Sequence, residues 1–300
     1  MIDLLMGGSP CQSLSIVQSQ FRQHLFGKSK LFFEFVRALE ELSPKYFLFE
    51  NVASMTEESK QIISELLKCE PILINSNCFS AQDRPRLYWT NIPNVKAELK
   101  PSETMLKDIM EGYVSEKYFY NYPLENIDMS KQVCAMMVYN NHDMHKRIFN
   151  PSFKCHTLTT CGGGNTQKKV LDGNRARKLT PLEYERLQTL PDNYTVGIAE
   201  THRYTAIGNG WTADVIAHIL SNIPENYLQV TVSLFDGISC GQVALGKAGK
   251  QYNQYYASEI DPYAIQVTQT NHPHTMQLGD ITKIDWETFK DRVNIIQKVS

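Results

Sequence analysis

The sequence has few cysteines for its length and none of the spacings that a metal site or a disulfide framework needs. Seven cysteines are scattered over 300 residues, and no two of them form a Cys-x-x-Cys pair. This pattern argues against zinc-binding motifs and against a disulfide-stapled fold. We therefore expect a reducing, intracellular setting and no metal ion.

Long apolar runs are also missing. No stretch approaches the roughly 20 consecutive apolar residues that a transmembrane helix needs. The apolar segment Met1–Met6 is short and carries no basic flank, so it predicts a buried strand rather than a signal peptide. We expect no association with a membrane.

Neither sign of charge dominates the sequence, because 30 Lys and Arg face 32 Asp and Glu for a net charge of −2. A nucleic-acid partner would therefore have to meet a local basic surface. The best candidates for such a surface are Lys168, Lys169, Arg175, Arg177 and Lys178. The alternative is that these residues belong to a solvated loop.

The hydrophobic pattern predicts two domains. Residues 1–92 and 203–300 alternate short apolar runs with segments of helical periodicity. This alternation is typical of α/β proteins, and we predict a doubly wound, mostly parallel, Rossmann-like sheet. Residues 93–202 are rich in charged residues, Tyr, Asn and Gly, and predict a second, smaller, irregular domain. Within it, Thr180, Pro181 and Glu183 predict the start of a helix.

Reactive side chains follow the predicted strands, where parallel α/β sheets gather their ligands. Cys11 lies in a Gly- and Pro-containing loop after the first apolar run, a setting that suits a nucleophilic thiolate. The alternative for Cys11 is a buried structural cysteine. Glu50 directly follows an apolar run and could act as an acid at the same edge of the sheet. The alternative for Glu50 is a helix cap or a solvated side chain.

Three later segments predict a cofactor site. The turn Asp236-Gly237 follows an apolar run and would let a ligand approach the backbone. Glu259 ends the next predicted strand and could accept the hydroxyls of a ribose. Asp280 could accept from an adenine amino group. This spacing also fits a dinucleotide, so the residues alone leave the cofactor undecided.

The segment Gln82-Asp83-Arg84-Pro85-Arg86 places two guanidinium groups at alternate positions. In an extended chain, both would lie on one side. Such a pair suits phosphate oxygens or the carbonyl of a base. The alternative is a surface strand held by salt bridges.

Taken together, these segments resemble the cytosine C5-DNA methyltransferase family. The resemblance rests on Gly7–Gln12, Glu50–Val52, Gln82–Arg86, Arg177–Gln188 with Pro191-Asp192, Gly208-Asn209, Phe235–Gly237, Glu259 and Asp280. It covers most of the chain outside residues 93–155. The segments Leu31–Phe35 and Leu234–Ile238 are most similar to the animal de novo branch of the family.

Two features depart from the family pattern. The glycine-rich cofactor loop reads Gly237-Ile238-Ser239-Cys240-Gly241 here, so its later glycines are replaced or displaced. The nucleophile segment also precedes the cofactor segments, whereas the family has the reverse order. This order predicts a circular permutation with the new join at residues 221–229.

The resemblance implies an enzyme that transfers a methyl group from S-adenosylmethionine to C5 of cytosine in double-stranded DNA, as a monomer and without a metal. Cys11 would attack C6 of the base, and Glu50 would hold the ring N3 and the exocyclic amine. Arg86, with Arg84, would bind the base carbonyl or a nearby phosphate. The target base must leave the duplex stack, and residues 13–27 would close over it.

The resemblance also implies two sets of binding residues. The cofactor set is Pro10, Asn209, Trp211, Phe235, Asp236, Gly237, Ile238, Glu259, Ile260, Asp280 and Ile281. The DNA-binding set is Ser13, Arg22, Gln82, Gly163, Gly164, Lys168 and Lys169. Residues 93–176 would recognise the DNA sequence, with 157–169 as the loop that reads bases or contacts phosphates.

Three other interpretations compete with this one. A branch of the same family methylates cytosine in transfer RNA with the same motifs. A homologue could also bind DNA without catalysis, although the presence of Cys11, Glu50 and Glu259 together argues against this. At the level of the fold, a nicotinamide-dependent oxidoreductase is the third interpretation.

Overall fold

The computed structural model describes residues 2–10, 31–161 and 165–299 of the chain. They form two compact units. The first, here called the sheet unit, comprises Met1–Ile74, Pro85–Glu98 and Val215–Ser300; the second, here called the smaller unit, comprises Asn75–Arg84 and Leu99–Asp214. These bounds differ from the predicted ones, because residues 75–84 and 203–214 pack within the smaller unit and residues 93–98 within the sheet unit.

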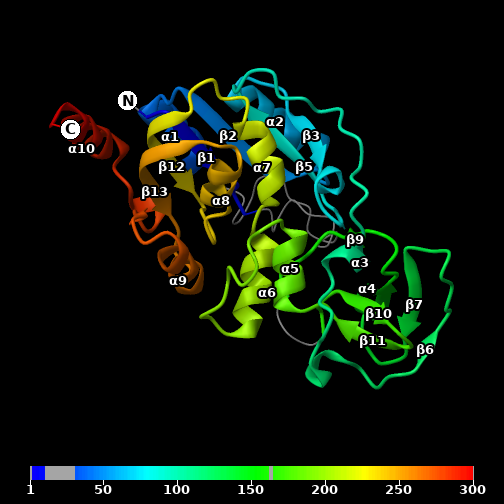
Figure 1. Cartoon of the computed structure of the whole chain (residues 1–300). Helices are drawn as coiled ribbons and strands as arrows, with labels where there is room; N and C mark the ends of the chain where they lie inside the picture. Colours follow the sequence, from blue (N-terminus) through cyan, green and yellow to red (C-terminus); the bar gives the residue numbers. More distant parts are fainter. Residues whose placement is uncertain (1, 11–30, 162–164, 300) are drawn as a thin grey trace. The chain divides into compact units, whose positions relative to one another are not determined.

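A seven-stranded sheet forms the centre of the sheet unit (Figure 1). Its order is β14 (Met276–Gln277), β13 (Gln251–Ser258), β12 (Tyr227–Leu234), β1 (Leu4–Gly7), β2 (Tyr46–Val52), β5 (Pro85–Thr90) and β3 (Ile72–Asn75). The pairs from β14 to β2 are parallel, and β2 pairs with β5 antiparallel. The prediction of a mostly parallel α/β sheet is therefore confirmed. The sheet also brings the beginning of the chain beside its last third, since Leu4 pairs with Thr231.

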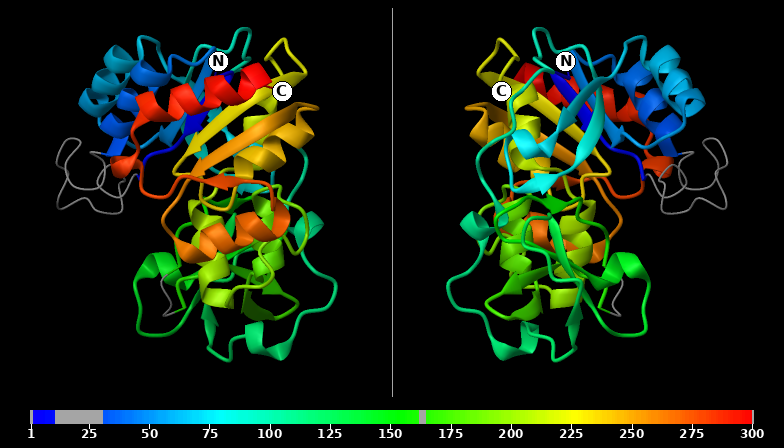
Figure 2. Two further views of the ribbon diagram at one scale, coloured as in Figure 1. Left: turned by 90° about the vertical axis from the view of Figure 1, so that its left-hand side faces the viewer. Right: turned by 90° about the vertical axis from the view of Figure 1, so that its right-hand side faces the viewer.

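Helices lie on both faces of this sheet. They are α1 (Phe32–Leu42), α2 (Glu57–Leu67), α7 (Ala213–Leu220), α8 (Cys240–Lys247), α9 (Pro262–Asn271) and α10 (Trp286–Val299). The helices α1 and α10 pack into one core on the same face (Figure 2). Leu5 of β1 joins that core, whereas its neighbour Met6 contacts α8 at Gly241 on the other face. Alternate residues of β1 thus pack against helices on opposite faces of the sheet.

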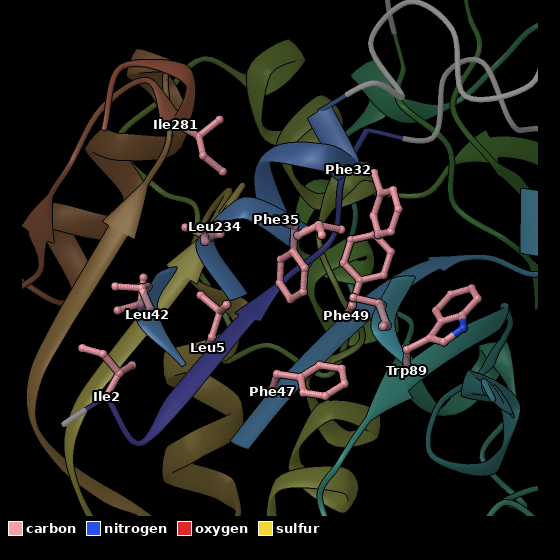
Figure 3. Packing of buried hydrophobic residues seen from close by; sticks show 14 of the residues in the cluster. Ile2, Leu5, Phe32, Phe35, Leu42, Phe47, Phe49, Trp89, Leu234 and Ile281 are labelled. Atoms are coloured by element: carbon pink, nitrogen blue, oxygen red, sulfur yellow. The ribbon is translucent and has the colours of Figure 1, made fainter. Parts of the chain in front are cut away.

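Aromatic side chains fill the core between α1 and the sheet (Figure 3). The rings of Phe35 and Phe49 have centroids 4.8 Å apart, and Trp89 lies 5.9 Å from Phe49. The indole nitrogen of Trp89 donates a hydrogen bond to Ser64 at 2.9 Å. These contacts fix the side chains of Phe49 and Trp89. Glu50 follows Phe49 directly in β2, so this core also holds the strand at Glu50. In the part of the chain that the structure describes, no helix has the length and apolar character needed to cross a membrane.

The smaller unit contains a five-stranded sheet and several short helices. The sheet order is β11 (Arg175–Lys178), β10 (Lys169–Asp172), β8 (Arg147–Phe149), β7 (Val133–Met137) and β6 (Leu124–Glu125). A further pair joins β4 (Gln82–Asp83) to β9 (Cys155–His156). The helices are α3 (Leu106–Ile109), α4 (Asp143–Lys146), α5 (Pro181–Leu187) and α6 (Glu200–Asn209).

The predicted start of α5 is confirmed. Thr180 accepts a hydrogen bond from the backbone N–H of Glu183, and the Glu183 carboxylate accepts one from the backbone N–H of Thr180. Pro181 occupies the first turn, where its missing N–H is not needed. This capping box satisfies backbone donors that a helix start otherwise leaves without partners.

Candidate active site

Glu50 and Arg86 form a charge pair near the carboxyl end of β2. In the register of β2 and β5, Val52 lies opposite Arg86, which places Arg86 diagonally beside Glu50. Arg86 Nε lies 2.9 Å from Glu50 Oε1, and each side chain is only 12% exposed. Arg86 Nη1 also donates to the carbonyl of Pro85 at 2.9 Å. A largely buried carboxylate is thus held beside a fixed cation, a contact that the sequence pattern did not predict.

The loop leading to the predicted nucleophile is anchored next to Glu50. Asn51 is buried, and its side-chain amide lies 3.4 Å from the carbonyl of Ser9 and 3.3 Å from the Ser9 hydroxyl. Pro10, half-buried, is the last described residue before Cys11. Ser9 and Asn51 are positioning residues that the sequence pattern did not indicate, although both lie inside segments that carry the family resemblance.

Several predicted site residues lie outside the described residues. They are Cys11, Ser13, Arg22, Gly163 and Gly164, and the expected closing loop 13–27 lies there as well. Their predicted roles stay predictions.

Arg84 does not share the environment of Arg86. It is 4% exposed, and its guanidinium donates to the carbonyls of Leu158 at 3.0 Å, Gly208 at 3.2 Å and Gly210 at 3.0 Å. The expectation of two accessible guanidinium groups on one side is therefore corrected. Arg84 instead ties the segment before residue 161 to the end of α6, inside the smaller unit.

Gln82 has the same structural character. It is buried, its side-chain oxygen accepts from the Leu158 N–H at 2.7 Å, and its amide donates to the Leu187 carbonyl at 3.2 Å. The predicted DNA contact of Gln82 is thus corrected to an internal one. Gly208 belongs to the same packing, because a Cβ there would lie 2.5 Å from the carbonyl oxygen of Thr159.

The residues of the predicted basic surface make contacts within the protein. Lys169 is buried and donates to the carbonyls of His145, Asn165 and Gln167, and burial lowers its pKa to about 8. Lys168 lies over the ring of Phe149 at 5.8 Å, and burial lowers its pKa too.

The other basic residues of that predicted surface have acidic partners. Arg177 is buried against Glu183, and Arg175 and Lys178 pair with Glu116 and Glu200. The prediction is corrected for Lys169 and Arg177, which are buried, whereas Lys168, Arg175 and Lys178 are partly exposed. Alternate residues of β10 and β11 also point to opposite sides of their sheet, so Lys178 and Arg177 do not share one face.

The cofactor segments meet at the carboxyl ends of β12, β13 and β14, which are neighbours in the sheet. Glu259 follows β13, and its Oε2 accepts from the Gly237 N–H at 2.8 Å. Its Oε1 accepts from the backbone N–H groups of Ile260 and Asp261 at 2.7 and 2.9 Å. Ile260 is 71% exposed beside it. Glu259 is therefore fixed at this edge with an apolar side chain next to it.

The remaining cofactor candidates of the sheet unit lie in different environments. Asp280 accepts from the backbone N–H and the hydroxyl of Thr282, and these bonds lower the pKa of Asp280. Ile238 and Ile281 are buried, so they support the loop rather than present a surface. Gly237 has φ +57° and no atom within 4 Å of where a Cβ would stand, which leaves space above this turn.

The backbone around that turn is strained. Phe235 has φ 56°, a left-handed conformation that costs a non-glycine residue on the order of 1–3 kcal/mol. The side chain of Asp236 points into the fold, where the Tyr255 hydroxyl donates to it at 2.8 Å. Tyr255 thus holds the carboxylate of Asp236, and the predicted contact of Asp236 with the cofactor stays a prediction.

Asn209 and Trp211 lie in the smaller unit, at and just after the end of α6. Asn209 is exposed and Trp211 is half-buried. Their predicted contact with the methionine end of the cofactor stays a prediction. Within the described residues, no group of three or more His, Cys, Asp or Glu side chains could hold a metal ion.

The decisive comparison is with protein families. The model of the C-5 cytosine-specific DNA methylase family matches residues 1–225 and 230–298. The chain belongs to this family. The two matched segments contain the charge pair of Glu50 and Arg86 and the turn at Gly237, which are therefore parts of a C-5 cytosine-specific DNA methylase domain.

Individual relatives come from plants, bacteria and phages. The chain is 29% identical over 227 residues to the DNA (cytosine-5)-methyltransferase DRM2 of Oryza sativa subsp. japonica, covering 70% of this chain and 36% of the relative. It is 25% identical over 247 residues to the type II methyltransferase M1.ScrFI of Lactococcus lactis subsp. cremoris, covering 74% and 62%. It is 27% identical over 219 residues to the orphan methyltransferase M.SPRI of Bacillus phage SPR, covering 54% and 49%. The chain thus spans less than two thirds of each of these methylases.

Proposed function

We propose that this chain transfers a methyl group from S-adenosylmethionine to C5 of cytosine in duplex DNA, through a covalent bond between Cys11 and C6 of a flipped-out base. The observation that carries the proposal is the Glu50–Arg86 pair beside the Ser9–Asn51 anchor, in a chain of the C-5 cytosine-specific DNA methylase family. The three relatives named above are all called methyltransferases, which supports the same reaction class.

The residues at the ends of β12 and β13 suit the proposed donor. The open turn at Gly237 gives a ligand access to the backbone, and the fixed carboxylate of Glu259 can accept the hydroxyls of a ribose. Exposed Ile260 offers an apolar surface for an adenine ring. When bound, S-adenosylmethionine supplies a methyl group that its sulfonium makes easy to displace.

The remaining chemistry falls to the side chains. The Cys11 thiolate would bond to C6, which moves electron density to C5 and makes that carbon a nucleophile. Glu50 would hold the ring N3 and the exocyclic amine and offset charge that develops on the ring. Arg86 fixes the Glu50 carboxylate for this task. After C5 is methylated, a base or water removes the C5 proton, and Cys11 leaves C6 with its electron pair.

We also propose that the motif order is circularly permuted and that the smaller unit, or most of it, recognises the DNA sequence. The permutation is supported by β12, which carries the first cofactor segment yet pairs in parallel with β1, the strand before the nucleophile loop. The family model also matches in two blocks with a break at residues 226–229.

Plasmid DNA from cells that express the protein tests the proposed reaction directly. Bisulfite sequencing should reveal 5-methylcytosine at one recurring sequence, absent from the same plasmid in cells without the protein. In parallel, purified protein should transfer labelled methyl groups to duplex DNA in preference to transfer RNA. Unmodified plasmid, or preferential labelling of transfer RNA, would overturn the proposal.

Replacement of Glu50 by glutamine should slow methyl transfer by about 100-fold, in the range expected for loss of a general acid. Glutamine keeps the shape of Glu50 but loses both the charge that pairs with Arg86 and the ionisable proton. Single-turnover methyl transfer to duplex DNA measures the effect. The matched control is Glu65→Gln on the exposed surface of α2, which should leave the rate unchanged. Equal rates for the Glu50→Gln variant and wild type would contradict the role.

A further inference from the structure

A partly buried hydrogen-bond network supports the loop that follows β12. The carboxylate of Asp236 accepts hydrogen bonds from the Tyr255 hydroxyl at 2.8 Å and from the Ser239 hydroxyl. The Ser239 hydroxyl in turn accepts from Gln242 Nε2 and from Thr268 Oγ1, both at 3.1 Å. The network therefore joins the loop to β13, to α8 and to α9.

The loop that this network supports has an unusual backbone. Phe235, Gly237 and Ser239 have φ values of 56°, 57° and 56°. Residues other than glycine rarely adopt this left-handed backbone conformation. The Asp236 N–H donates to the Ser258 carbonyl at 3.1 Å, and the Asp236 carbonyl accepts from the Ser239 N–H at 3.1 Å. Asp236 thus holds the loop through its N–H, its carbonyl and its carboxylate.

A displaced glycine makes room for the Tyr255 hydroxyl. A Cβ on Gly241, in the first turn of α8, would lie 3.0 Å from Tyr255 Oη and 2.5 Å from Met6 Cε. The glycine lets α8 pack closely against the strand residue whose hydroxyl reaches Asp236. The glycine at position 241, which departs from the family's glycine pattern, therefore occurs together with the hydrogen bond from Tyr255 to the Asp236 carboxylate.

We infer that Asp236 is a positioning residue for the methyl donor, which acts through Ser239 and Tyr255 to hold the left-handed loop rather than by touching the donor. The loop in turn presents the Gly237 N–H, which binds the Glu259 carboxylate at 2.8 Å. Loss of the Asp236 contacts would release Gly237 and misplace Glu259. The inference rests on the proposed donor.

The charges around Asp236 predict how donor binding depends on pH. The groups that face it are Ser233 of β12, Ser239 before α8, Tyr252 and Tyr255 of β13, and Glu259. Burial raises the pKa of Asp236 to about 6, the three hydroxyls of Ser233, Ser239 and Tyr255 lower it, and the charge of Glu259 raises it. A bound sulfonium cation favours the ionised carboxylate. The donor should therefore bind more tightly above pH 6 than below it.

The raised pKa of Asp236 has the opposite effect on the stability of the fold, which should decrease as the pH rises. A carboxyl group whose pKa is raised in the folded state contributes stability that is present at low pH and is lost as the pH rises through about 6. At pH 8, the neutral variant Asp236→Asn should therefore melt at or above the temperature of the wild-type protein. A residue with only a structural role would show the reverse.

Equilibrium dialysis with S-adenosylmethionine in the absence of DNA tests the inference in the full chain from pH 5 to pH 8. If binding lowers the pKa of Asp236 by one unit, wild type should bind about fivefold more weakly at pH 5 than at pH 8, since the full tenfold effect of one unit is reached only well below pH 5. The Asp236→Asn variant should bind about tenfold more weakly at pH 8, with no step near pH 6, for loss of a contact to a charged group.

Two variants at neighbouring positions of β13 provide a matched comparison. Tyr255→Phe removes a hydrogen bond to the ionised carboxylate, so the midpoint of the pH step should move upward. Tyr256→Phe makes the same chemical change one residue later, where the hydroxyl bonds to Gln254 at 3.3 Å, and should behave as wild type.

The outcomes separate this inference from the proposed function. If wild type fails to bind S-adenosylmethionine at every pH, the proposed donor and the inference are both wrong. If wild type binds but Asp236→Asn keeps its affinity and its pH step, only the positioning role is wrong. A variant that both melts lower at pH 8 and loses binding would make Asp236 a structural residue and would overturn the inference.

Discussion

The Cys11→Ser variant should leave plasmid DNA unmethylated, with a rate reduced by more than about 10⁴-fold, as for loss of a covalent nucleophile. A serine hydroxyl at neutral pH has almost no alkoxide, whereas a cysteine thiol supplies some thiolate. Without the bond to C6, C5 of cytosine stays too weak a nucleophile to accept the methyl group. Bisulfite sequencing of plasmid from cells that express the variant measures the loss.

DNA that contains 5-fluorocytosine tests the same role of Cys11, because it should trap the covalent adduct. Fluorine in place of hydrogen at C5 cannot leave as a cation, so the adduct between Cys11 and C6 cannot break down after methylation. Wild type should form a complex with 5-fluorocytosine DNA that survives denaturing electrophoresis, and Cys11→Ser should not. The control is Cys69→Ser, since this half-buried cysteine lies just beyond the end of α2. An adduct in the Cys11→Ser variant would contradict the assignment.

Local patterns were enough to predict the sheet and the places where its strands end. Strand and helix alternate in the segments around Glu50 and Gly237, and each pattern depends on residues within a few positions. The capping box at Thr180 and Glu183 is local in the same sense. Such signals survive folding because the contacts that they describe are made by neighbours in the chain.

The two arginines of the Gln82–Arg86 segment show where a local pattern fails. Their spacing predicts one shared side, but the chain passes from the smaller unit to the sheet unit between Arg84 and Pro85. Arg84 then meets three carbonyls and Arg86 meets Glu50. Periodicity says which residues point the same way in one strand, and it carries no information across a boundary between units.

Buried charge was the second feature that the sequence could not reveal. Lys169 and Arg177 looked like a surface for DNA, yet both are fully buried with specific partners. The partners of Lys169 are backbone carbonyls, which every residue has, so composition cannot identify them. Asp236 is similar, because its position in a cofactor motif predicted a ligand while Tyr255, on the next strand, takes its carboxylate.

The Arg177→Met variant should destabilise the smaller unit by about 3–5 kcal/mol, the usual effect of removing one partner from a buried ion pair. Arg177 Nη1 and Nη2 each donate to the Glu183 carboxylate at 2.7 Å, and neither side chain is exposed to solvent. Without Arg177, the capping carboxylate of α5 would be buried without this cationic partner. The exchange of β10 and β11 amide hydrogens, followed by mass spectrometry in increasing urea, reports on this unit specifically.

Its matched control is Arg175→Met, two positions earlier in β11. Arg175 also forms an ion pair, with Glu116, but the two side chains are 37% and 78% exposed. Exposed pairs contribute roughly 0–1 kcal/mol, so this variant should be close to wild type. Adding Glu183→Gln to Arg177→Met should recover part of the lost stability, because the buried carboxylate is then neutral. Equal losses for the two single variants, or no recovery in the double variant, would show that the Glu183 charge is not what makes Arg177 necessary.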